Sequence, residues 1–358
     1  MPLQTDYLTP PVLTSAHIGH TVLCHRPVRA LMPAMTAGRF GTQIIACNYG
    51  HAGFGWIMAP GSTGFVLDQM TTLVNAQAKK QAITIVGAGI MGLMAAYQLL
   101  QRGYHDITVV AQGHTHLTSH KAVGFFSPTI ELGKSWITQD IKTIVRASYA
   151  FYQDILAGRQ PDFAPSSLLQ LPMYTAKPNL NGIILSPSPA QRVIIDFGTG
   201  AAHEVIKQEG GLLIHVNVMM QQLAALLTKH GVRFETQVLK RIEDAQAPIV
   251  INCAGLGAGK LMHDTSMVPA QGHLVHLINQ PPEALRYLLM LEREKKHTGT
   301  GFQVKRSVYL APRHHLDNPH GQHALLGATS IRGADETTPH PEEFERVLEQ
   351  AHAYFYGR

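Results

Sequence analysis

The chain has 358 residues, of which 45% are hydrophobic and 15% are charged, with a net charge of +5 at neutral pH. This length and composition predict a soluble globular protein of one large or two moderate domains. The three cysteines lie far apart without CxxC spacing, which indicates neither a disulfide framework nor a zinc site and favours a cytoplasmic location. No apolar run approaches the roughly 18 residues of a membrane span. Lys and Arg are scattered, so neither a membrane nor a nucleic acid is an expected partner.

The N-terminal part combines a basic corner with a glycine-rich loop. Two arginines flank a proline in the corner at residues 26–29. Three glycines within six residues, in the loop at 48–56, let the backbone approach a flat partner closely. The elements expected here are strands over 20–24 and 42–47, a helix over 61–74, and a polar linker over 75–81.

The strongest motif is a glycine-rich turn between a short buried strand at 83–86 and a helix. Gly87 permits the sharp turn, Gly89 lets the backbone approach a pyrophosphate, and Gly92 allows close packing of helix on strand. The free amides at the helix N-terminus favour an anion there. A second strand at 107–110 completes the βαβ unit, so the sequence predicts a dinucleotide site. The motif comprises Gly87, Ala88, Gly89, Ile90, Met91 and Gly92.

Two further segments are expected near the nucleotide. A polar loop at 117–124 follows the βαβ unit, and an apolar strand at 247–253 ends in the small residues Ala254 and Gly255. The second strand of the βαβ unit ends near Gln112, where an acidic residue for a ribose is usual. No arginine is there to hold a 2′-phosphate, which disfavours NADP.

The remaining pattern alternates short strands and helices. Strands without helical crossovers in the last third predict an antiparallel sheet beside the α/β domain. The expected helices span 136–157, 203–209, 218–230 and 341–356, and the expected strands span 232–235, 247–253, 272–277, 307–310 and 324–328.

Together these motifs resemble the D-amino acid oxidase and glycine oxidase family of FAD-dependent amine oxidoreductases. The resemblance covers nearly the whole chain and rests on residues 26–29, 48–55, 85–92, 118–124, 250–255, 269–272, 309–312 and 326–329. In the family, the Arg-Pro-x-Arg corner and the glycine loop come at the C-terminal end. Here they precede the nucleotide-binding strand, so the sequence looks circularly permuted, by nature or by design.

The resemblance implies an α/β fold with a Rossmann-like FAD-binding domain and an antiparallel-sheet substrate domain in permuted order. Both domains are then discontinuous. The FAD-binding domain would take residues 40–150 and 205–268, and the substrate-binding domain 1–39, 151–204 and 269–358. The implied reaction is oxidative deamination of a small amino acid, by hydride transfer from Cα to the flavin, with oxygen or another electron acceptor.

The resemblance also assigns roles to individual residues. Arg26 matches the arginine that holds the substrate carboxylate, Tyr309 matches a tyrosine bonded to the same group, and Gly53 lies where the backbone approaches the flavin and accepts the substrate amine. Beyond the glycine-rich turn, the implied cofactor-binding residues are His51, Ala52, Phe54, Gly55, Trp56, Ile57, Gln112, Thr118, Ser119, His120, Lys121, Ala122, Val238, Cys253, Ala254 and Gly255.

Three positions depart from the family pattern. Ala52 stands where the first glycine of a pair is frequent, Gln112 replaces an acid, and Lys305 occupies a place where a second aromatic residue occurs. These departures leave open a glycine or sarcosine-type secondary amine oxidase, and a flavin-binding protein with little turnover. The side-chain preference, the electron acceptor and the oligomeric state are also left open by the sequence.

No metal site is expected, although the chain contains 21 histidines. Four of these histidines lie in or directly after the polar segment 313–322, without carboxylate or cysteine partners that could complete a metal site. A solvated loop is the better interpretation of these histidines. They are His314, His315, His320 and His323.

Overall fold

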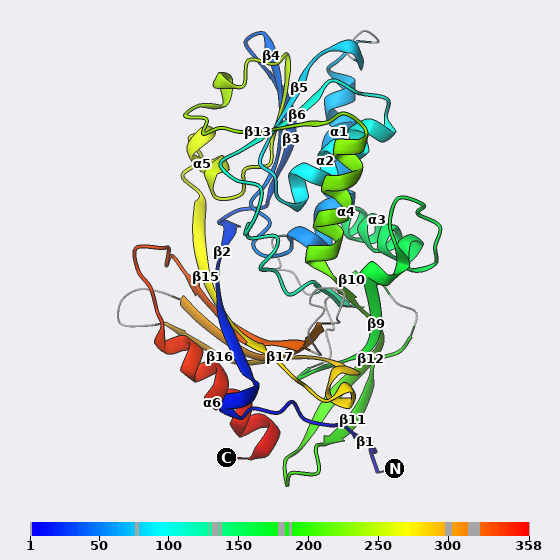
Figure 1. Ribbon diagram of the computed structural model, residues 1–358, viewed down its shortest axis with the longest axis vertical. Helices are drawn as coiled ribbons and strands as arrows, with labels where there is room; N and C mark the ends of the chain where they lie inside the picture. Colours follow the sequence, from blue (N-terminus) through cyan, green and yellow to red (C-terminus); the bar gives the residue numbers. More distant parts are fainter. Residues whose placement is uncertain are drawn as a thin grey trace.

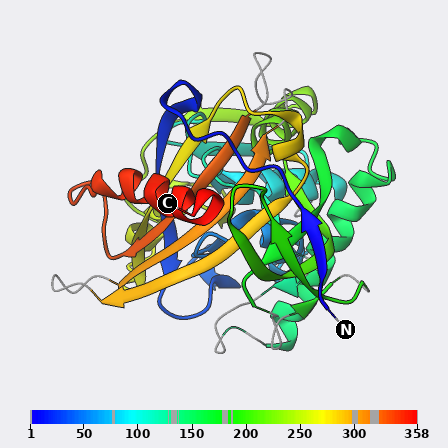
Figure 2. The ribbon, with the colours of Figure 1, turned by 90° about the horizontal axis from the view of Figure 1, so that it is seen from below.

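The computed structural model describes residues 2–75, 79–127, 129–130, 136, 138–177, 183–185, 188–297, 303–313 and 323–357. Within these ranges, two large sheets lie one above the other in Figure 1, with a two-stranded sheet of β8 and β10 beside them. Helices cover the upper, six-stranded sheet, and α6 lies across the lower, ten-stranded sheet, as Figure 2 shows from below. No helix in the described part of the chain has the length and apolar character needed to cross a membrane.

The six-stranded sheet has the order β13-β6-β5-β14-β4-β3. All neighbours are parallel except β3 and β4. Counted from β5, the five parallel strands follow the order 3-2-1-4-5 of dinucleotide-binding sheets, whose ligands bind beyond the carboxyl ends. The strand β4 fills the fifth place although it precedes β5 in the chain. The strands are β3 Ala34–Phe40, β4 Gln43–Tyr49, β5 Ile83–Val86, β6 Ile107–Ala111, β13 Arg233–Thr236 and β14 Ile249–Asn252.

The helices agree with the predicted set except at three places, one of which is a short helix at Gly257–Leu261 that was not predicted. The predicted helix at 203–209 is wrong, because these residues belong to a strand, and the helix predicted from residue 61 begins earlier. The helices are α1 Gly55–Thr72, α2 Ile90–Gln101, α3 Gln139–Leu156, α4 Val216–Lys229, α5 Gly257–Leu261 and α6 Glu342–Tyr356, with short 3-10 turns at Ser15–His17, Pro165–Ser167, Ile242–Asp244 and Pro282–Leu285.

The early start of α1 depends on contacts with α3. Pro60 has no N–H to donate to the carbonyl of Trp56, one helical turn earlier. The hydroxyl of Tyr152 donates to that carbonyl at 2.7 Å instead. In addition, the amide of Gly61 donates to Ser148 Oγ at 2.9 Å. These contacts with α3 stabilise a helix that continues past Pro60 and Gly61, whereas the sequence pattern predicts that the helix begins at residue 61.

The ten-stranded sheet has the order β1-β11-β12-β9-β16-β17-β18-β15-β2, with β7 beside β12. The prediction of an antiparallel sheet is wrong at two pairs, since β1 with β11 and β16 with β9 run parallel. These partners are distant in sequence, so no hairpin sets their direction. The strands are β1 Gln4–Tyr7, β2 Ile18–Arg29, β7 Phe125–Phe126, β9 Leu168–Thr175, β11 Gln191–Asp196, β12 Ala202–Ile214, β15 Met267–Leu277, β16 Leu288–His297, β17 Gln303–Arg313 and β18 His323–Arg332, and the small sheet pairs β8 Thr129–Ile130 with β10 Ile183–Ile184.

The strand β12 replaces the helix predicted at 203–209. It pairs with β11 along one side and with β9 along the other. Both sides of its backbone are therefore hydrogen-bonded within the sheet, and this pairing overrides the weak local helical preference. The strands β1, β3 and β16 were not predicted.

Candidate active site

The glycine-rich turn lies at the carboxyl edge of the six-stranded sheet. Gly87 has φ +111°, and a Cβ atom there would lie 2.5 Å from the carbonyl oxygen of Cys253. A Cβ atom on Gly92 would lie 1.8 Å from the carbonyl oxygen of Gly87. Helix α2 starts after Gly89 without a side-chain cap and without an acidic residue in its first turn. The amide of Ile90 donates to Ser119 Oγ, and the turn offers its other first-turn amides and a positive helix end to an anion.

Gly92→Ala should destabilise this turn and weaken cofactor retention. Its Cβ atom would meet a backbone oxygen that cannot rotate away, and such overpacking typically costs about 1–3 kcal/mol. Gly113→Ala is the matched control, because nothing lies within 4 Å of a Cβ atom there. Flavin content after gel filtration and the urea midpoint of unfolding measure both effects. Equal flavin content in the two variants would contradict the role given to Gly92.

The loop after β4 joins the two large sheets. Its backbone takes positive φ at Gly50, Ala52 and Gly53, with values of +84°, +51° and +92°. The amide of Ala52 donates to the carbonyl of Pro27 on β2 at 2.8 Å. On the other side, a Cβ atom at Gly55 would lie 3.8 Å from Ile90 Cγ2 at the start of α2. The loop therefore spans from the glycine-rich turn to the ten-stranded sheet.

Ala52→Gly should stabilise the protein. A non-glycine residue in the left-handed region costs about 1–2 kcal/mol, and the extra freedom of glycine in the unfolded chain offsets part of this gain. We expect a net increase of up to about 1 kcal/mol in the free energy of unfolding. Ala225→Gly, at an exposed position of α4, should change it by about 1 kcal/mol in the opposite direction. A lower urea midpoint for Ala52→Gly would contradict this expectation.

His51 in the same loop is buried, with 3% of its surface exposed. Burial lowers its pKa to about 3, so the ring is neutral at physiological pH. Among the residues that the structure describes, its Nε2 atom has no hydrogen-bond partner. A neutral polar atom at this place is suited to a bound polar group beside the loop.

Arg26 on β2 and Tyr309 on β17 interact across two intervening strands. Glycines on the two intervening strands provide the space that the Arg26 and Tyr309 side chains occupy. A Cβ atom at Gly272 on β15 would lie 2.8 Å from Arg26 Nη2, and one at Gly327 on β18 would lie 3.3 Å from the Tyr309 ring. The two long side chains can therefore lie over the sheet face and meet. Both glycines lie in segments on which the family resemblance rests, 269–272 and 326–329, but the sequence alone assigns them no role.

Gly53 completes this arrangement from the other sheet. A Cβ atom there would lie 3.1 Å from Arg26 Cδ, so any larger residue would press on the arginine. Arg26 Nη1 donates to the carbonyl of Thr329 at 3.4 Å. The structure thus brings together Arg26, Tyr309 and Gly53, the three residues predicted at the substrate.

Both polar side chains keep the protonation states that anion binding needs. Burial acts to lower the pKa of Arg26, but the neighbouring Tyr309 and Cys24 raise it overall, so the guanidinium stays charged. Burial raises the pKa of Tyr309, although Arg26 acts in the opposite sense, so the phenol remains a hydrogen-bond donor. A fixed cation beside a neutral hydroxyl donor is suited to a carboxylate.

The loop at 117–124 touches both sheets. Ser119 Oγ accepts from the amide of Ile90 at 2.9 Å, and its carbonyl accepts from Trp56 Nε1 at 3.0 Å. Thr118 Oγ1 donates to the carbonyl of His25 at 3.3 Å, and Arg313 Nη2 donates to the carbonyl of Ala122 at 2.7 Å. This loop therefore lies between the glycine-rich turn and the Arg26 strand.

The other predicted cofactor residues lie around the same edge at different depths. Cys253 is buried, and its amide donates to the carbonyl of Val86 at 2.8 Å. Gln112 is exposed directly after β6, and Val238 is 62% exposed beyond β13. Half-buried positions are Ala52, Phe54, Gly55, His120, Lys121, Ala254 and Gly255, and buried ones are Ala88, Ile90, Met91, Trp56 and Ile57.

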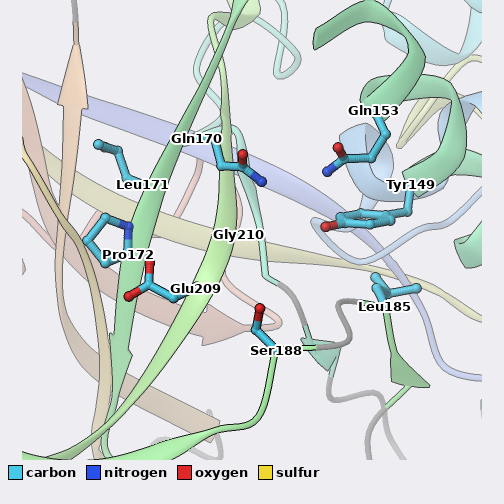
Figure 3. A pocket seen from close by; sticks show the side chains of 9 residues that line it. All are labelled: Tyr149, Gln153, Gln170, Leu171, Pro172, Leu185, Ser188, Glu209 and Gly210. Atoms are coloured by element: carbon cyan, nitrogen blue, oxygen red, sulfur yellow. The ribbon is translucent and has the colours of Figure 1, made fainter. Parts of the chain in front are cut away.

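A cavity of about 620 Å³ lies between α3 and the strands β9 and β12. Polar side chains from all three elements border it, as Figure 3 shows. Leu171 in its wall also packs in the apolar cluster that includes Tyr309 and Phe125. In the sheet, however, β16 lies between β9 and the Tyr309 strand, and four strands lie between β9 and the Arg26 strand, so the cavity borders a different part of the sheet from this pair. Within the described ranges, no three His, Cys, Asp or Glu side chains are grouped as a metal site requires, and His314, His315 and His320 fall outside those ranges.

Comparison with known proteins decides the family. A family profile described as "FAD dependent oxidoreductase" matches residues 82–357, which is most of the chain. The chain belongs to this family of FAD-dependent oxidoreductases. As a member of the family, it is an enzyme that uses FAD.

Individual relatives agree with this assignment. The chain is 24% identical to a D-amino-acid oxidase of Streptomyces coelicolor over 278 residues, covering 76% of this chain and 77% of the relative. It is 24% identical to a D-amino-acid oxidase of Fusarium vanettenii over 293 residues, covering 75% and 76%. The solved structure of glycine oxidase from Geobacillus kaustophilus shares the fold, with a TM-score of 0.55 at 16% identity, covering 76% of this chain and 78% of that one.

The residues present fit FAD. The backbone at Gly87 and Gly92 leaves no room for side chains, as a pyrophosphate cradle requires. The loop after β4 adds a second stretch of uncovered backbone, with the unpartnered Nε2 of His51 beside it. Two backbone surfaces meeting at one sheet edge suit a cofactor that has a nucleotide at one end and a flat ring at the other.

Proposed function

We propose that this enzyme catalyses the oxidative deamination of a small amino acid, in the manner of a D-amino acid oxidase. The observation that carries this proposal is the meeting of Arg26, Tyr309 and Gly53 between the two sheets. Arg26 and Tyr309 come from the ten-stranded sheet, and Gly53 comes from the loop beside the glycine-rich turn. A guanidinium and a phenol beside the loop backbone at Gly53 support a carboxylate site next to a flavin.

Each of these residues has a stated task in the proposal. The planar guanidinium of Arg26 binds the substrate carboxylate with two hydrogen bonds, and the hydroxyl of Tyr309 donates a third. The carbonyl of Gly53 accepts a hydrogen bond from the substrate amine and so orients Cα. FAD, when bound, supplies the redox chemistry by taking a hydride from Cα. No acid–base residue is required if the amine binds in its neutral form.

The proposed FAD-binding residues are those named from the sequence. When FAD is bound, the backbone at 87–92 would hold its pyrophosphate, and the strand end at 253–255 and the loop at 118–122 would contribute further contacts. The loop at 51–57 would hold the flavin, and Gln112 would hydrogen-bond a ribose without charge. Val238 lies at the periphery, where its exposure is 62%.

We also propose that the chain is a circular permutation of the family order. The family match starts at residue 82, whereas β2, β4 and α1 precede it. These elements supply Arg26, the fifth parallel strand and the loop around Gly53. We propose the domain division given above, with residues 40–150 and 205–268 forming the FAD-binding domain and 1–39, 151–204 and 269–358 forming the substrate domain. Two of its borders cut across strands, since β3 at 34–40 lies in the six-stranded sheet and β12 at 202–214 lies in the ten-stranded sheet.

Two alternative functions use the same site. One is a glycine or sarcosine-type secondary amine oxidase, for which the glycine oxidase fold gives support. The other is a flavin-binding protein with little turnover, because Ala52 strains the loop. Rates of anaerobic flavin reduction by D-alanine, glycine and sarcosine separate the three. We expect the highest rate with D-alanine, and no flavin reduction by any of them would refute the proposal.

A further inference from the structure

One carboxylate ties together the ends of strands from both large sheets. Asp264 lies between α5 and β15, and its Oδ2 atom accepts from Arg29 Nε at 2.7 Å and from the hydroxyl of Tyr49 at 3.0 Å. Its Oδ1 atom accepts from the amide of Ser266 at 3.0 Å and from Ser266 Oγ. Arg29 ends β2, Tyr49 ends β4, and Ser266 precedes β15. In Figure 1, β2 and β15 rise from the lower sheet toward the upper one at this side of the molecule.

Asp264 and Arg29 form a partly buried ion pair at this junction. Asp264 is 12% exposed and Arg29 is 23% exposed, so water screens their ion pair only in part. Burial acts to raise the pKa of Asp264, but the bonds from Ser266, Arg29 and Tyr49 hold it far below its usual range. Arg29 Nη1 also donates to the carbonyl of Met32 at 2.7 Å. Asp264 is therefore ionised at physiological pH, and it accepts four hydrogen bonds.

The junction adjoins both halves of the candidate active site. Arg29 follows Arg26 by three residues on β2, and Tyr49 leads directly into the loop that carries Gly53. The same two segments meet again where the amide of Ala52 donates to Pro27. A shift between Arg29 and Tyr49 would thus be passed on to the separation of Arg26 and Gly53.

We propose that Asp264 is a positioning residue that fixes the distance between the substrate-binding side chain of Arg26 and the flavin-facing loop at Gly53. The proposal rests on the function proposed above for these two residues. Asp264 touches neither the substrate nor the cofactor. It acts through Arg29 on one strand and through Tyr49 on the other.

The first test compares Asp264→Asn with wild type by hydrogen exchange. The amide of Ala52 should exchange about tenfold faster in the variant, because hydrogen bonds to a charged group are lost at the junction. Asp244→Asn is the matched control, since Asp244 also accepts backbone amides and pairs with an arginine, but only within its own turn. Tyr49→Phe removes one hydrogen bond of the junction, so it should act in the same direction and tests the proposal even if Asp264→Asn does not fold.

The second test is anaerobic reduction of the bound flavin by substrate. Asp264→Asn should lower the limiting reduction rate about tenfold or more, because about 1 Å of misplacement can cost about 100-fold. The dissociation constant of the substrate should stay within about twofold, since Arg26 itself remains. A loss confined to thermal stability, with an unchanged limiting rate, would overturn the positioning role.

The two tests separate this proposal from the proposed function. If no amino acid reduces the wild-type flavin, the proposed function fails, while exchange at Ala52 still reports on the junction. Unchanged exchange in both Asp264→Asn and Tyr49→Phe would refute the role of Asp264, whatever the activity. Faster exchange in these variants but not in Asp244→Asn would support it.

Discussion

Arg26→Ala should raise the KM for the amino acid at least about thirtyfold, because truncating one partner of a buried charge pair costs about 2–5 kcal/mol. The protein should remain yellow with an unchanged flavin spectrum, since Arg26 lies on the substrate side of the site. Arg26→Lys should recover only part of the affinity, because an ammonium group cannot form the two parallel hydrogen bonds of a guanidinium. Steady-state kinetics and absorption spectra measure these effects.

Arg192→Ala is the matched control for this substitution. Arg192 lies on β11 of the same sheet and pairs with Glu204, and both side chains are largely exposed. Exposed ion pairs contribute about 0–1 kcal/mol, so the control should keep wild-type kinetics. Unchanged amino acid turnover in Arg26→Ala would show that the carboxylate binds elsewhere.

Deletion of residues 1–75 should abolish both folding and FAD retention. The deletion removes β4 from its place between β14 and β3, and it removes α1, which packs against α2 and α3. It also takes away Arg26 and the loop around Gly53. The strand β14 would lose its partner on one side and expose a hydrogen-bonding edge, so we expect an insoluble, colourless product.

A rearranged chain is the control for this deletion. Residues 80–357 would come first, followed by a flexible linker and residues 2–75. The linker must cross the lower sheet, because the two ends of the chain lie on opposite sides of it in Figure 1. Near one of these ends, Tyr356 donates a hydrogen bond to the carbonyl of Pro11 at 2.9 Å. This chain should fold and bind FAD, since it retains every element in a different order. A truncated protein that stays soluble, yellow and active would instead contradict the need for residues 1–75.

The local parts of the fold could be predicted from the sequence. The strand at 83–86 and the glycine-rich turn carry their signal in adjacent residues, and the structure has β5 over the predicted range. Elements that depend on distant partners were misjudged. The segment at 203–209 forms a strand because β9 and β11 pair with it, and α1 passes through Pro60 because Tyr152 satisfies the freed carbonyl.

The same distinction holds for the active site. The family resemblance identified Arg26 and Tyr309. The glycines that make space for these two side chains lie on neighbouring strands, and this arrangement is visible only in the folded sheet. Asp264 lies 235 positions from Arg29 and 215 from Tyr49 in the sequence. No local pattern connects residues so far apart, so this junction could be found only in the structure.

The most direct test of the proposed function is the visible spectrum of the purified protein during anaerobic titration with D-alanine. The protein should be yellow, its released cofactor should have the mass of FAD, and D-alanine should bleach the flavin absorbance. Arg26→Ala should need a far higher concentration of D-alanine for the same bleaching. A yellow protein that is not bleached by D-alanine, glycine or sarcosine would contradict the proposal that this site deaminates amino acids.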